Sequence, residues 1–374
     1  MKHWIRKAAV LVLALSLTLG MAGCGSRIDG TKTAVTVDGE SISLGQISFD
    51  AHYQAAMMYT YYNQYMSGGY FDVIYDEEAG TTYGMGIVDS TADDLANLVV
   101  ISRHAADYGI ALTDEEKAEI DAVAQQYIDA NDKETRDKIG ASKEDVVKNL
   151  TLYKIQEKMH AAIGEEVDPE IPDDEAQQTS ISFLTMTVPS KESVQTEDPS
   201  LADADDEKIA EAIAAADEEV KATMQQVLDE LLAREDNATL DLKEFGTPFS
   251  EKINGGVVGY TTNAETPEIS AALVEKTKGL AEGEIYPEVF MNTDGSQYYI
   301  ARLDKVFDEE RTETKKTSLL RTKKNEHYDE VLNAWKEAAA IEKNADEIGK
   351  IVLTDKNLFL FKLSEEELAA MSGQ

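Results

Sequence analysis

Residues 254–303 constrain the fold most, because they form the one long stretch whose pattern is that of turns, short strands and a brief helix. Gly255-Gly256 and Gly259 bracket a Val-Val pair, which is typical of a strand entered through a tight glycine turn. A short apolar helix is expected over 269–274, and the alternation in 298–303 predicts a closing strand. The sequence on both sides is charged and has helical periodicity. We therefore expect an α+β fold in which a small sheet is inserted into a helical protein.

The order of these landmarks resembles the parvulin type of peptidyl-prolyl isomerase domain. The matching features are the glycine turn, the short helix behind Pro267, the Gly-Glu-Ile of 283–285 and the closing YYIARL strand. The run 179–188, TSISFLTMTV, matches the first strand of such a domain. The resemblance implies a parvulin-like domain over 171–307, with a small antiparallel sheet flanked by helices.

The flanking helices extend the resemblance to the PrsA and SurA family of extracytoplasmic foldases. A strand at 34–37, an Asp-Gly turn and a capping box from Ser43 to Gln46 precede a long helix, which is how these foldases begin. The phrases ADYGIALTDEEKAEIDA and HYDEVLNAWKEAAAIEKN resemble the family's helix–turn–helix and its returning helix. The resemblance implies a discontinuous, mainly helical chaperone lobe, made of residues 34–170 and 308–363, around the inserted domain.

The first long helix is expected to carry aromatic and methionine side chains around most of its circumference. They are Phe49, Tyr53, Met57, Met58, Tyr59, Tyr61, Tyr62, Tyr65 and Met66. Such side chains pack well in a core, and they also adapt to the irregular apolar surface of an unfolded client. The sequence leaves both interpretations of residues 49–66 open.

The N-terminus predicts export and lipid attachment. Three basic residues precede an apolar run over 8–19 that is too short for a comfortable membrane span. The following Met-Ala-Gly-Cys resembles the lipobox of bacterial lipoproteins, although an ordinary secretory signal with a chance cysteine is the alternative. Cys24 is the sole cysteine, so an intramolecular disulfide is excluded. We expect a signal peptide over 1–23, a tether over 24–33, and a lipid on Cys24 that anchors the chain to the extracytoplasmic face of the cell membrane.

Composition excludes several classes of partner. The formal net charge of −37 repels phosphate backbones, so nucleic-acid binding is excluded, and it disfavours anionic lipid headgroups. Solubility explains this charge better than acidic recognition does. His52, His104 and His160 lack the spacing of a metal site on one helix, and the acidic residues of 203–206 lack the glycine and final glutamate of a calcium loop. We expect no metal and no cofactor.

The parvulin resemblance also names candidate catalytic positions. The family has histidines in its first and last strands, and these align with Ser182 and Tyr299. The Cys or Asp of the family falls near Glu251 or Lys252. Serine and tyrosine hydroxyls both donate and accept, so Ser182 and Tyr299 could still hydrogen-bond across the sheet.

The proline pocket of the family aligns with Glu265 and Ile269, and Phe290 is a further candidate for its lining. An apolar seat around Ile269, Phe290 and Ile300 would favour isomerase activity. The departures from the family pattern together predict that the isomerase chemistry has degenerated.

Two functions follow from these expectations. The first is a membrane-anchored foldase or holdase whose partners are unfolded or partly folded secreted polypeptides. The alternative is an active parvulin-type prolyl isomerase. An envelope protein that binds a small ligand is a weaker third possibility, since no phosphate loop or nucleophile–base pair recommends it.

Overall fold

The computed structural model describes residues 27–62, 69–264 and 269–354, the side chains of 59–62 excepted. The chain divides into two compact units, which are described separately here. Unit 1 combines Met1–Val167 with Lys324–Gln374, and unit 2 is Asp168–Lys323. The sequence predicts that the helical lobe resumes at residue 308. The division instead falls inside α12 (Glu309–Ala338), because that helix continues unbroken across it.

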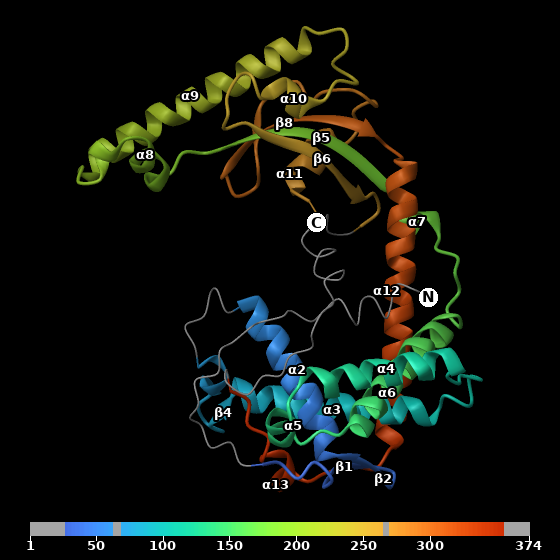
Figure 1. Cartoon of the computed structure of the whole chain (residues 1–374). Coiled ribbons are helices and arrows are strands. Elements are labelled where there is room, and N and C mark those ends of the chain that lie inside the picture. The colour runs from blue at the N-terminus through green and yellow to red at the C-terminus, as the bar shows by residue number, and fades with distance from the viewer. Residues whose placement is uncertain (1–26, 63–68, 265–268, 355–374) are drawn as a thin grey trace. The chain divides into compact units, whose positions relative to one another are not determined.

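Unit 1 is mainly helical. Its helices are α2 (Leu44–Tyr62), α3 (Tyr83–Arg103), α4 (Asp114–Ala130), α5 (Lys133–Ile139), α6 (Lys143–Gly164) and α13 (Ala345–Ile348), with η1 (Tyr70–Asp72). Its strands are β1 (Thr33–Val37), β2 (Glu40–Ser43), β3 (Ile74–Asp76), β4 (Thr81–Thr82) and β9 (Ile341–Lys343). Both α3 and α4 contact α6 (Figure 1). The sheet has the order β2-β1-β9, so a strand from the C-terminal part of unit 1 pairs with one from its N-terminal part.

The capping box predicted from Ser43 to Gln46 is confirmed, and a second box opens α4. The Ser43 hydroxyl accepts the Gln46 amide at 3.0 Å, and the Gln46 side chain accepts the Ser43 amide at 3.1 Å. At the start of α4, Thr113 and Glu116 make the same reciprocal pair at 3.2 and 2.8 Å. Each pair satisfies amides that the first helical turn leaves without a partner.

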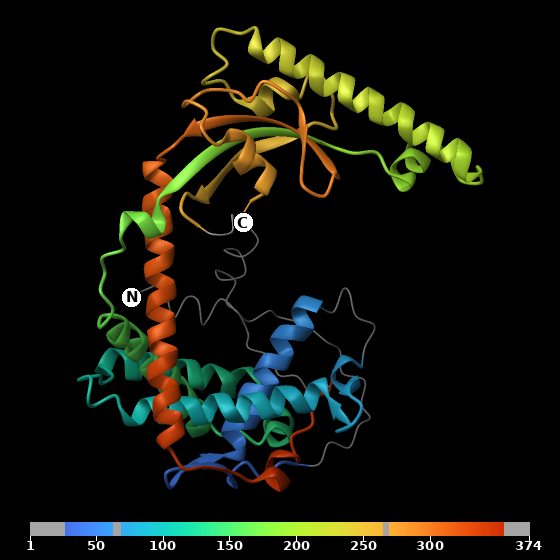
Figure 2. The same cartoon turned by 180° about the vertical axis from the view of Figure 1, so that it is seen from behind.

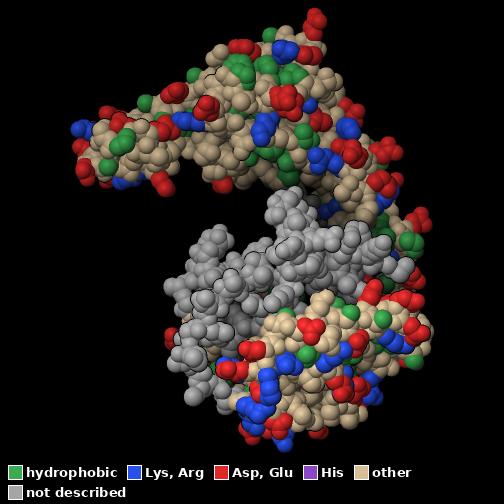
Figure 3. Space-filling view, viewed as in Figure 1, with side chains coloured by type: hydrophobic (Ala, Val, Ile, Leu, Met, Phe, Trp, Pro, Cys, Tyr) green, Lys and Arg blue, Asp and Glu red, His purple; other side chains and the backbone are tan. Residues whose placement is uncertain are grey.

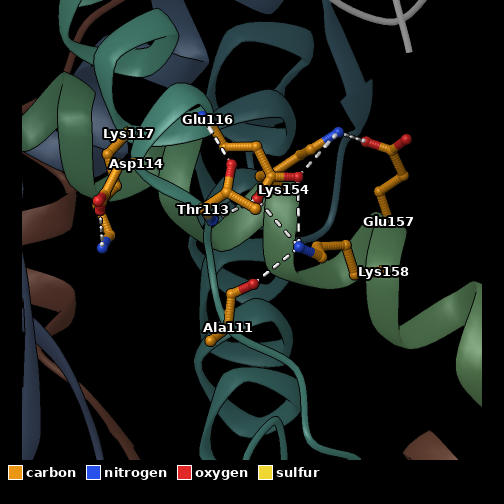
Figure 4. A network of polar contacts seen from close by, with 8 residues as sticks. All are labelled: Ala111, Thr113, Asp114, Glu116, Lys117, Lys154, Glu157 and Lys158. Atoms are coloured by element: carbon orange, nitrogen blue, oxygen red, sulfur yellow. Dashed lines mark hydrogen bonds and ion pairs between the residues drawn. The ribbon is translucent and has the colours of Figure 1, made fainter.

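Glu116 also ties α4 to α6. Lys158 donates to its carboxylate at 3.0 Å and to the carbonyl of Ala111 at 2.7 Å (Figure 4). Burial favours the neutral acid, but the Thr113 amide and Lys158 outweigh burial and lower the pKa of Glu116. The cap therefore also fixes the packing of two helices.

The described part of the aromatic helix belongs mainly to the core. Phe49 is buried and meets the Tyr127 ring edge-on at 5.1 Å, and Tyr53 is partly buried beside the same cluster. Met57 and Met58 are half-buried. The side chains of Tyr59, Tyr61, Tyr62, Tyr65 and Met66 lie outside the described residues.

Unit 2 is an antiparallel sheet with helices on both faces. Its strands are β5 (Gln178–Thr187), β6 (Asn254–Thr261), β7 (Phe290–Met291) and β8 (Gln297–Lys305), in the order β6-β5-β8-β7. Its helices are α7 (Asp173–Ala176), α8 (Lys191–Glu197), α9 (Asp206–Leu232), α10 (Leu242–Gly246) and α11 (Ala271–Thr277), with η2 (Pro199–Leu201). Helices α9 and α10 cover one face and α11 covers the other (Figures 1 and 2). The α+β prediction is confirmed.

One segment of unit 2 differs from the expectation. Residues 190–206 are polar and lack apolar periodicity, which is typical of a solvated loop, yet they include α8 and η2. Ser190 and Ser193 cap α8 reciprocally at 2.8 and 3.2 Å, and Val194 is buried beneath it. The reciprocal serine cap and one buried valine therefore stabilise α8, although its sequence lacks apolar periodicity.

The surface is charged on both units. Asp and Glu side chains are scattered over the visible surface rather than gathered in one place (Figure 3), which agrees with a solubilising role. Within residues 27–62, 69–264 and 269–354, no helix is long and apolar enough to cross a membrane.

Candidate functional site

The register of the sheet separates the two predicted catalytic residues. Directly paired residues of an antiparallel sheet share a face, and faces alternate along each strand. Tyr299 on β8 pairs with Thr185 on β5, whereas Ser182 pairs with Arg302. Thr185 is three positions after Ser182 on β5, an odd step along the strand, so Ser182 and Tyr299 lie on opposite faces. The predicted hydrogen bond between them is wrong. On β5, Phe183 shares the face of Tyr299, with ring centroids 5.7 Å apart.

Ser182 belongs to a buried polar cluster on the face covered by α9 and α10. Its hydroxyl donates to Asp304 at 2.5 Å and accepts from Arg302 Nη2 at 3.3 Å. Arg302 Nε donates to Asp304 at 2.6 Å, and its Nη1 donates to the carbonyls of Asn237 and Leu240 at 2.8 and 2.9 Å. Arg302 is only 6% exposed, and a buried charge requires this degree of pairing. The Ser182 hydroxyl therefore uses its hydrogen bonds on the ion pair between Arg302 and Asp304.

Tyr299 lies in an aromatic cluster on the face covered by α11. Its hydroxyl donates to the Gln297 side chain at 2.7 Å. Its ring stacks on Phe290 with centroids 5.9 Å apart, and Phe290 meets Tyr286 edge-on at 5.5 Å. Burial raises the pKa of the Tyr299 hydroxyl, so it stays neutral at physiological pH. This face offers aromatic surface and one phenol.

The structure brings together only part of the predicted proline pocket. Ile269 is partly buried and packs in the cluster that contains Phe290 and Tyr299. Ile300 packs in the core on the opposite face, so the expected trio of Ile269, Phe290 and Ile300 does not form. Glu265 lies outside the described residues, as does Cys24.

The remaining candidates are surface residues. Glu251 and Lys252 are exposed in the turn before β6, where the Lys252 ammonium pairs with Glu197 at 2.6 Å.

Within the described part of the chain, no group of three or more His, Cys, Asp or Glu could hold a metal ion. His52 Nδ1 donates to the Ser48 carbonyl at 2.7 Å, and His104 stacks on Trp335 at 4.1 Å.

A cavity of about 670 Å³ lies in unit 2 on the Ser182 face of the sheet. Its lining includes the charged residues Asp304, Lys305, Asp308, Glu310 and Arg311. A proline ring needs an apolar seat, so this lining does not suit one.

Sequence reasoning missed an apolar surface on unit 1, which we call the hairpin patch. Its members are Val73, Ile74, Tyr75, Tyr83 and Met85, which are 38% to 55% exposed. Val73 directly precedes β3, Ile74 and Tyr75 belong to β3, and Tyr83 and Met85 lie in the first turn of α3. The Val-Ile-Tyr run of 73–75, which follows Gly68-Gly69, was its main sequence signal.

The hairpin patch is a built surface. Tyr83 stacks on Tyr70 with centroids 4.7 Å apart, and Tyr75 tilts over Tyr83 at 5.2 Å. Phe71, buried beneath, anchors the segment in the core of unit 1. The hairpin β3–β4 and the Thr82 cap of α3 fix the backbone, so the exposed side chains are held in place.

No protein-family model matches the chain, and no curated protein matches it. Three solved structures are similar to it. Foldase protein PrsA from Streptococcus pneumoniae is 17% identical to this chain and has a TM-score of 0.28. The matched region covers 67% of this chain and 84% of the PrsA chain. A structure titled for PEB4 and Cj1289, SurA-like chaperones of Campylobacter jejuni, is 14% identical over 83% of this chain and 98% of its own, with a TM-score of 0.25. Foldase protein PrsA from Lactococcus lactis is 13% identical over 86% of this chain and 100% of its own, with a TM-score of 0.30.

With TM-scores of 0.25 to 0.30, these likenesses carry no inference about residues or activity. The chain is similar to solved foldases and SurA-like chaperones, the class that its sequence resembles.

Proposed function

We propose that the chain is a membrane-anchored, extracytoplasmic foldase or holdase that shields secreted polypeptides while they fold. The hairpin patch carries this proposal. Five large apolar side chains stand exposed in a segment of 13 residues, on a chain with net charge −37. Apolar clusters of this kind mark interaction sites on soluble proteins.

The chemistry of the hairpin patch suits unfolded clients. Tyrosine and methionine supply large contact areas and tolerate varied partners, so they do not require one fixed shape. The acidic surface around it keeps molecules of this chain apart, which limits self-association through the patch. Partners with exposed apolar side chains would be favoured over folded, charged proteins.

Anchoring through Cys24 is the part of the proposal that rests on sequence alone. A lipid on Cys24, after removal of residues 1–23, would hold the chain where secreted polypeptides emerge. Cys24→Ala should release the protein into the medium or leave it unprocessed, as fractionation and the mass of the N-terminus would reveal. A normally processed variant that stays on the membrane would contradict the anchor.

We further propose that unit 2 is a parvulin-like module without the family's polar cluster. Ser182 is held by Arg302 and Asp304, and Tyr299 lies on the other face. Such a module would serve as a spacer or a peptide-binding surface. The alternative, an active prolyl isomerase, draws support from the aromatic cluster of Phe290 and Tyr299, which could seat a proline ring.

Light scattering of reduced, aggregating lysozyme tests the holdase role. The variant Ile74→Ser/Tyr75→Ser/Met85→Ser of the mature chain should need about tenfold more protein for equal suppression, because each substitution at a half-exposed position removes roughly 0.5 kcal/mol of apolar contact and the three losses add to about 1.5 kcal/mol. The matched control is Leu232→Ser/Val257→Ser/Val306→Ser, which changes three exposed apolar side chains of unit 2. Equal suppression by the wild type and the patch variant, or a loss in the control alone, would refute the role of the hairpin patch.

A further inference from the structure

Strand β6 is an open edge of the unit 2 sheet. It stands first in the order β6-β5-β8-β7, and among the described residues no strand pairs with its outer side. The opposite edge strand, β7, has two residues, whereas β6 has eight, and residues 255–259 of β6 are half-buried or exposed. A long open edge presents a row of unpaired backbone donors and acceptors. In unit 2, β6 therefore offers main-chain groups to a further strand.

The hydrogen bonds show which groups of β6 point outward. The Thr262 amide donates to the Gln177 carbonyl at 2.8 Å, so the main chain of Thr262 faces β5. Because this direction alternates along an antiparallel strand, the odd-numbered residues of 255–259 direct their N–H and C=O groups away from β5. Arg311 Nη2 donates to the Val257 carbonyl at 3.4 Å, which agrees with this assignment. The outward groups recur about every 6.8 Å, and a second extended backbone has the same spacing.

This edge lacks the features that keep exposed strands from pairing. Natural edges carry lysines, prolines or bulges. Residues 254–262 read NGGVVGYTT, without a charged residue or a proline. Their register with β5 runs without a shift from Asn254 to Thr261, so the edge is regular. Arg311 covers it weakly, because its hydrogen bond to Val257 is long and its side chain is 41% exposed.

The two faces beside the edge differ in chemistry. A Cβ atom built on Gly256 would have no heavy atom of the described residues within 4 Å, apart from its chain neighbours. This open space lies on the face of Val258 and Phe183, which pack in the aromatic cluster. The other face borders the charged cavity of about 670 Å³, whose lining includes Val257 and Arg311. An added strand would therefore place alternate side chains in an apolar and a polar environment.

A second copy of this chain fits the edge poorly. Glycines occupy three of the six positions from 254 to 259, so two such edges would bring few side chains into contact. The formal net charge of −37 also repels a second copy. A strand with large apolar side chains on one face and polar ones on the other suits both environments. Unfolded polypeptides expose such segments before their own sheets form.

We propose that the outer edge of β6 binds an extended segment of an unfolded polypeptide, which joins the sheet of unit 2 as a fifth strand. The segment alternates apolar and polar side chains, and its main chain exchanges hydrogen bonds with Val257 and Gly259. Its origin in a client rests on the function proposed above, whereas strand addition itself does not. Main-chain recognition accepts many sequences, so the edge complements the hairpin patch, which offers apolar side chains.

Residue-resolved amide exchange of the mature chain tests the added strand. The probe is a peptide of alternating valine and threonine with blocked ends and a lysine at each terminus. At saturating peptide, the outward amides of Val257 and Gly259 should exchange about tenfold more slowly, whereas the inward amides of Gly256 and Val258 should change little. The control is the same peptide with every amide N-methylated, which has no N–H to donate. Equal effects of the two peptides, or no effect of either, would overturn the proposal.

A variant of the edge gives a second test. Val257→Pro should weaken peptide binding about tenfold, because it removes one outward N–H and leaves the ladder to β5 intact. Val257→Thr keeps the amide and should bind as the wild type does. Equal binding by the two variants would overturn the proposal. Exchange of the β5 and β8 amides shows whether the proline variant is folded, and if it is not, the N-methylated peptide decides.

Lysozyme aggregation separates strand addition from the holdase role. Protection of Val257 and Gly259 by the peptide, without suppression of aggregation by the wild type, would refute the holdase role and leave the added strand standing. Suppression without that protection would refute the added strand and leave the holdase role standing. If both proposals hold, Val257→Pro should need several-fold more protein than Val257→Thr for equal suppression.

Discussion

The two units neutralise a buried carboxylate in different ways. In unit 1, Asp50 is 4% exposed, and Tyr153 donates to it at 3.0 Å. Its hydrogen-bond donors, Tyr153 and Asn149, are neutral, and burial raises its pKa to about 7. In unit 2, Asp304 accepts a charged hydrogen bond from Arg302 Nε at 2.6 Å. Burial favours the protonated form of Asp50, whereas a permanent cation neutralises Asp304.

The difference indicates how each unit can serve the proposed function. A proton leaves when the pH rises, whereas arginine stays charged at every physiological pH. Unit 1 therefore combines an interior that responds to conditions with the exposed hairpin patch. Unit 2 pairs the buried Asp304 with Arg302 and covers both faces of its sheet. This difference supports the proposal that clients bind the hairpin patch of unit 1 and that the covered sheet faces of unit 2 have a structural task.

The largest expected effect concerns catalysis by unit 2. Isomerisation requires lowering a rotational barrier of roughly 18–20 kcal/mol by stabilising a twisted amide. Ser182 and Tyr299 do not share a face, so their two hydroxyls cannot act together on one amide. Losing two or three such interactions, at about 1–3 kcal/mol each, lowers the rate by roughly two to five orders of magnitude.

A protease-free assay of the mature chain on X-Pro peptides measures this deficit. The control is an ordinary parvulin under the same conditions. A catalytic efficiency within about tenfold of that enzyme, lost in Tyr299→Phe, would make unit 2 an isomerase and reverse the assignment of roles.

The sequence predicted the strands of this site but not its faces. Alternation is a local signal, so β5 and β8 follow from neighbouring residues, as the Ser43–Gln46 capping box of unit 1 does. The face of Ser182 depends on which residue of β8 lies opposite, and a one-residue shift reverses every side chain. In β5, buried apolar residues occupy both faces, since Ile181 and Leu184 are each fully buried. The strand therefore lacks the one-sided pattern that would fix its orientation.

The hairpin patch was missed for a different physical reason. Val73, Ile74 and Tyr75 lie between glycines and an acidic run, and Tyr83 and Met85 follow that run, so neither helical nor strand periodicity extends far enough to be detected. The cap on Thr82 starts α3 at Tyr83, before the regular apolar spacing of that helix begins. The exposure of Ile74 and Tyr75 follows from tertiary packing around Phe71, which sequence spacing does not encode.

The next largest effect concerns the proton on Asp50. Because the pKa of this carboxyl is raised from 3.8 to about 7 in the folded state, its favourable contribution is complete below pH 3.8 and is lost as the pH rises through about 7. Asp50→Asn keeps a neutral side chain at all pH values. The variant should be more stable than the wild type by about 4 kcal/mol at pH 8, and the difference should vanish near pH 4.

Unfolding of unit 1 can be followed through Trp335, which is the only tryptophan after residue 23 and stacks on His104. The difference between the two proteins isolates Asp50 from other titrating groups, including His52, whose pKa burial lowers to about 4. A difference that does not change with pH would show that Asp50 is not the proton-neutralised group.

A somewhat smaller effect is expected when the permanent cation of unit 2 is removed. Arg302→Met keeps the aliphatic bulk but leaves Asp304 buried without its partner, which costs about 3 kcal/mol. Hydrogen exchange of β5 and β8 amides reports the loss. The matched control, Arg234→Ala, removes an exposed arginine from Asp236 and should leave exchange in the sheet unchanged. Similar losses in the two variants would mean that Arg302 does no more than a surface ion pair.

The smallest effect separates a structural Ser182 from a catalytic one. Ser182→Ala removes one donor to Asp304 and one acceptor for Arg302 Nη2, while the Nε and Nη1 hydrogen bonds remain. Exchange of β5 and β8 amides should accelerate by roughly tenfold, since one buried hydrogen bond is worth about 1–2 kcal/mol. Any residual isomerisation of X-Pro peptides should stay at the wild-type rate. Ser182→Thr retains the hydroxyl and should restore much of the protection. A slower isomerisation with unchanged exchange would instead assign Ser182 to catalysis, and the buried ion pair of unit 2 would then be part of an active site.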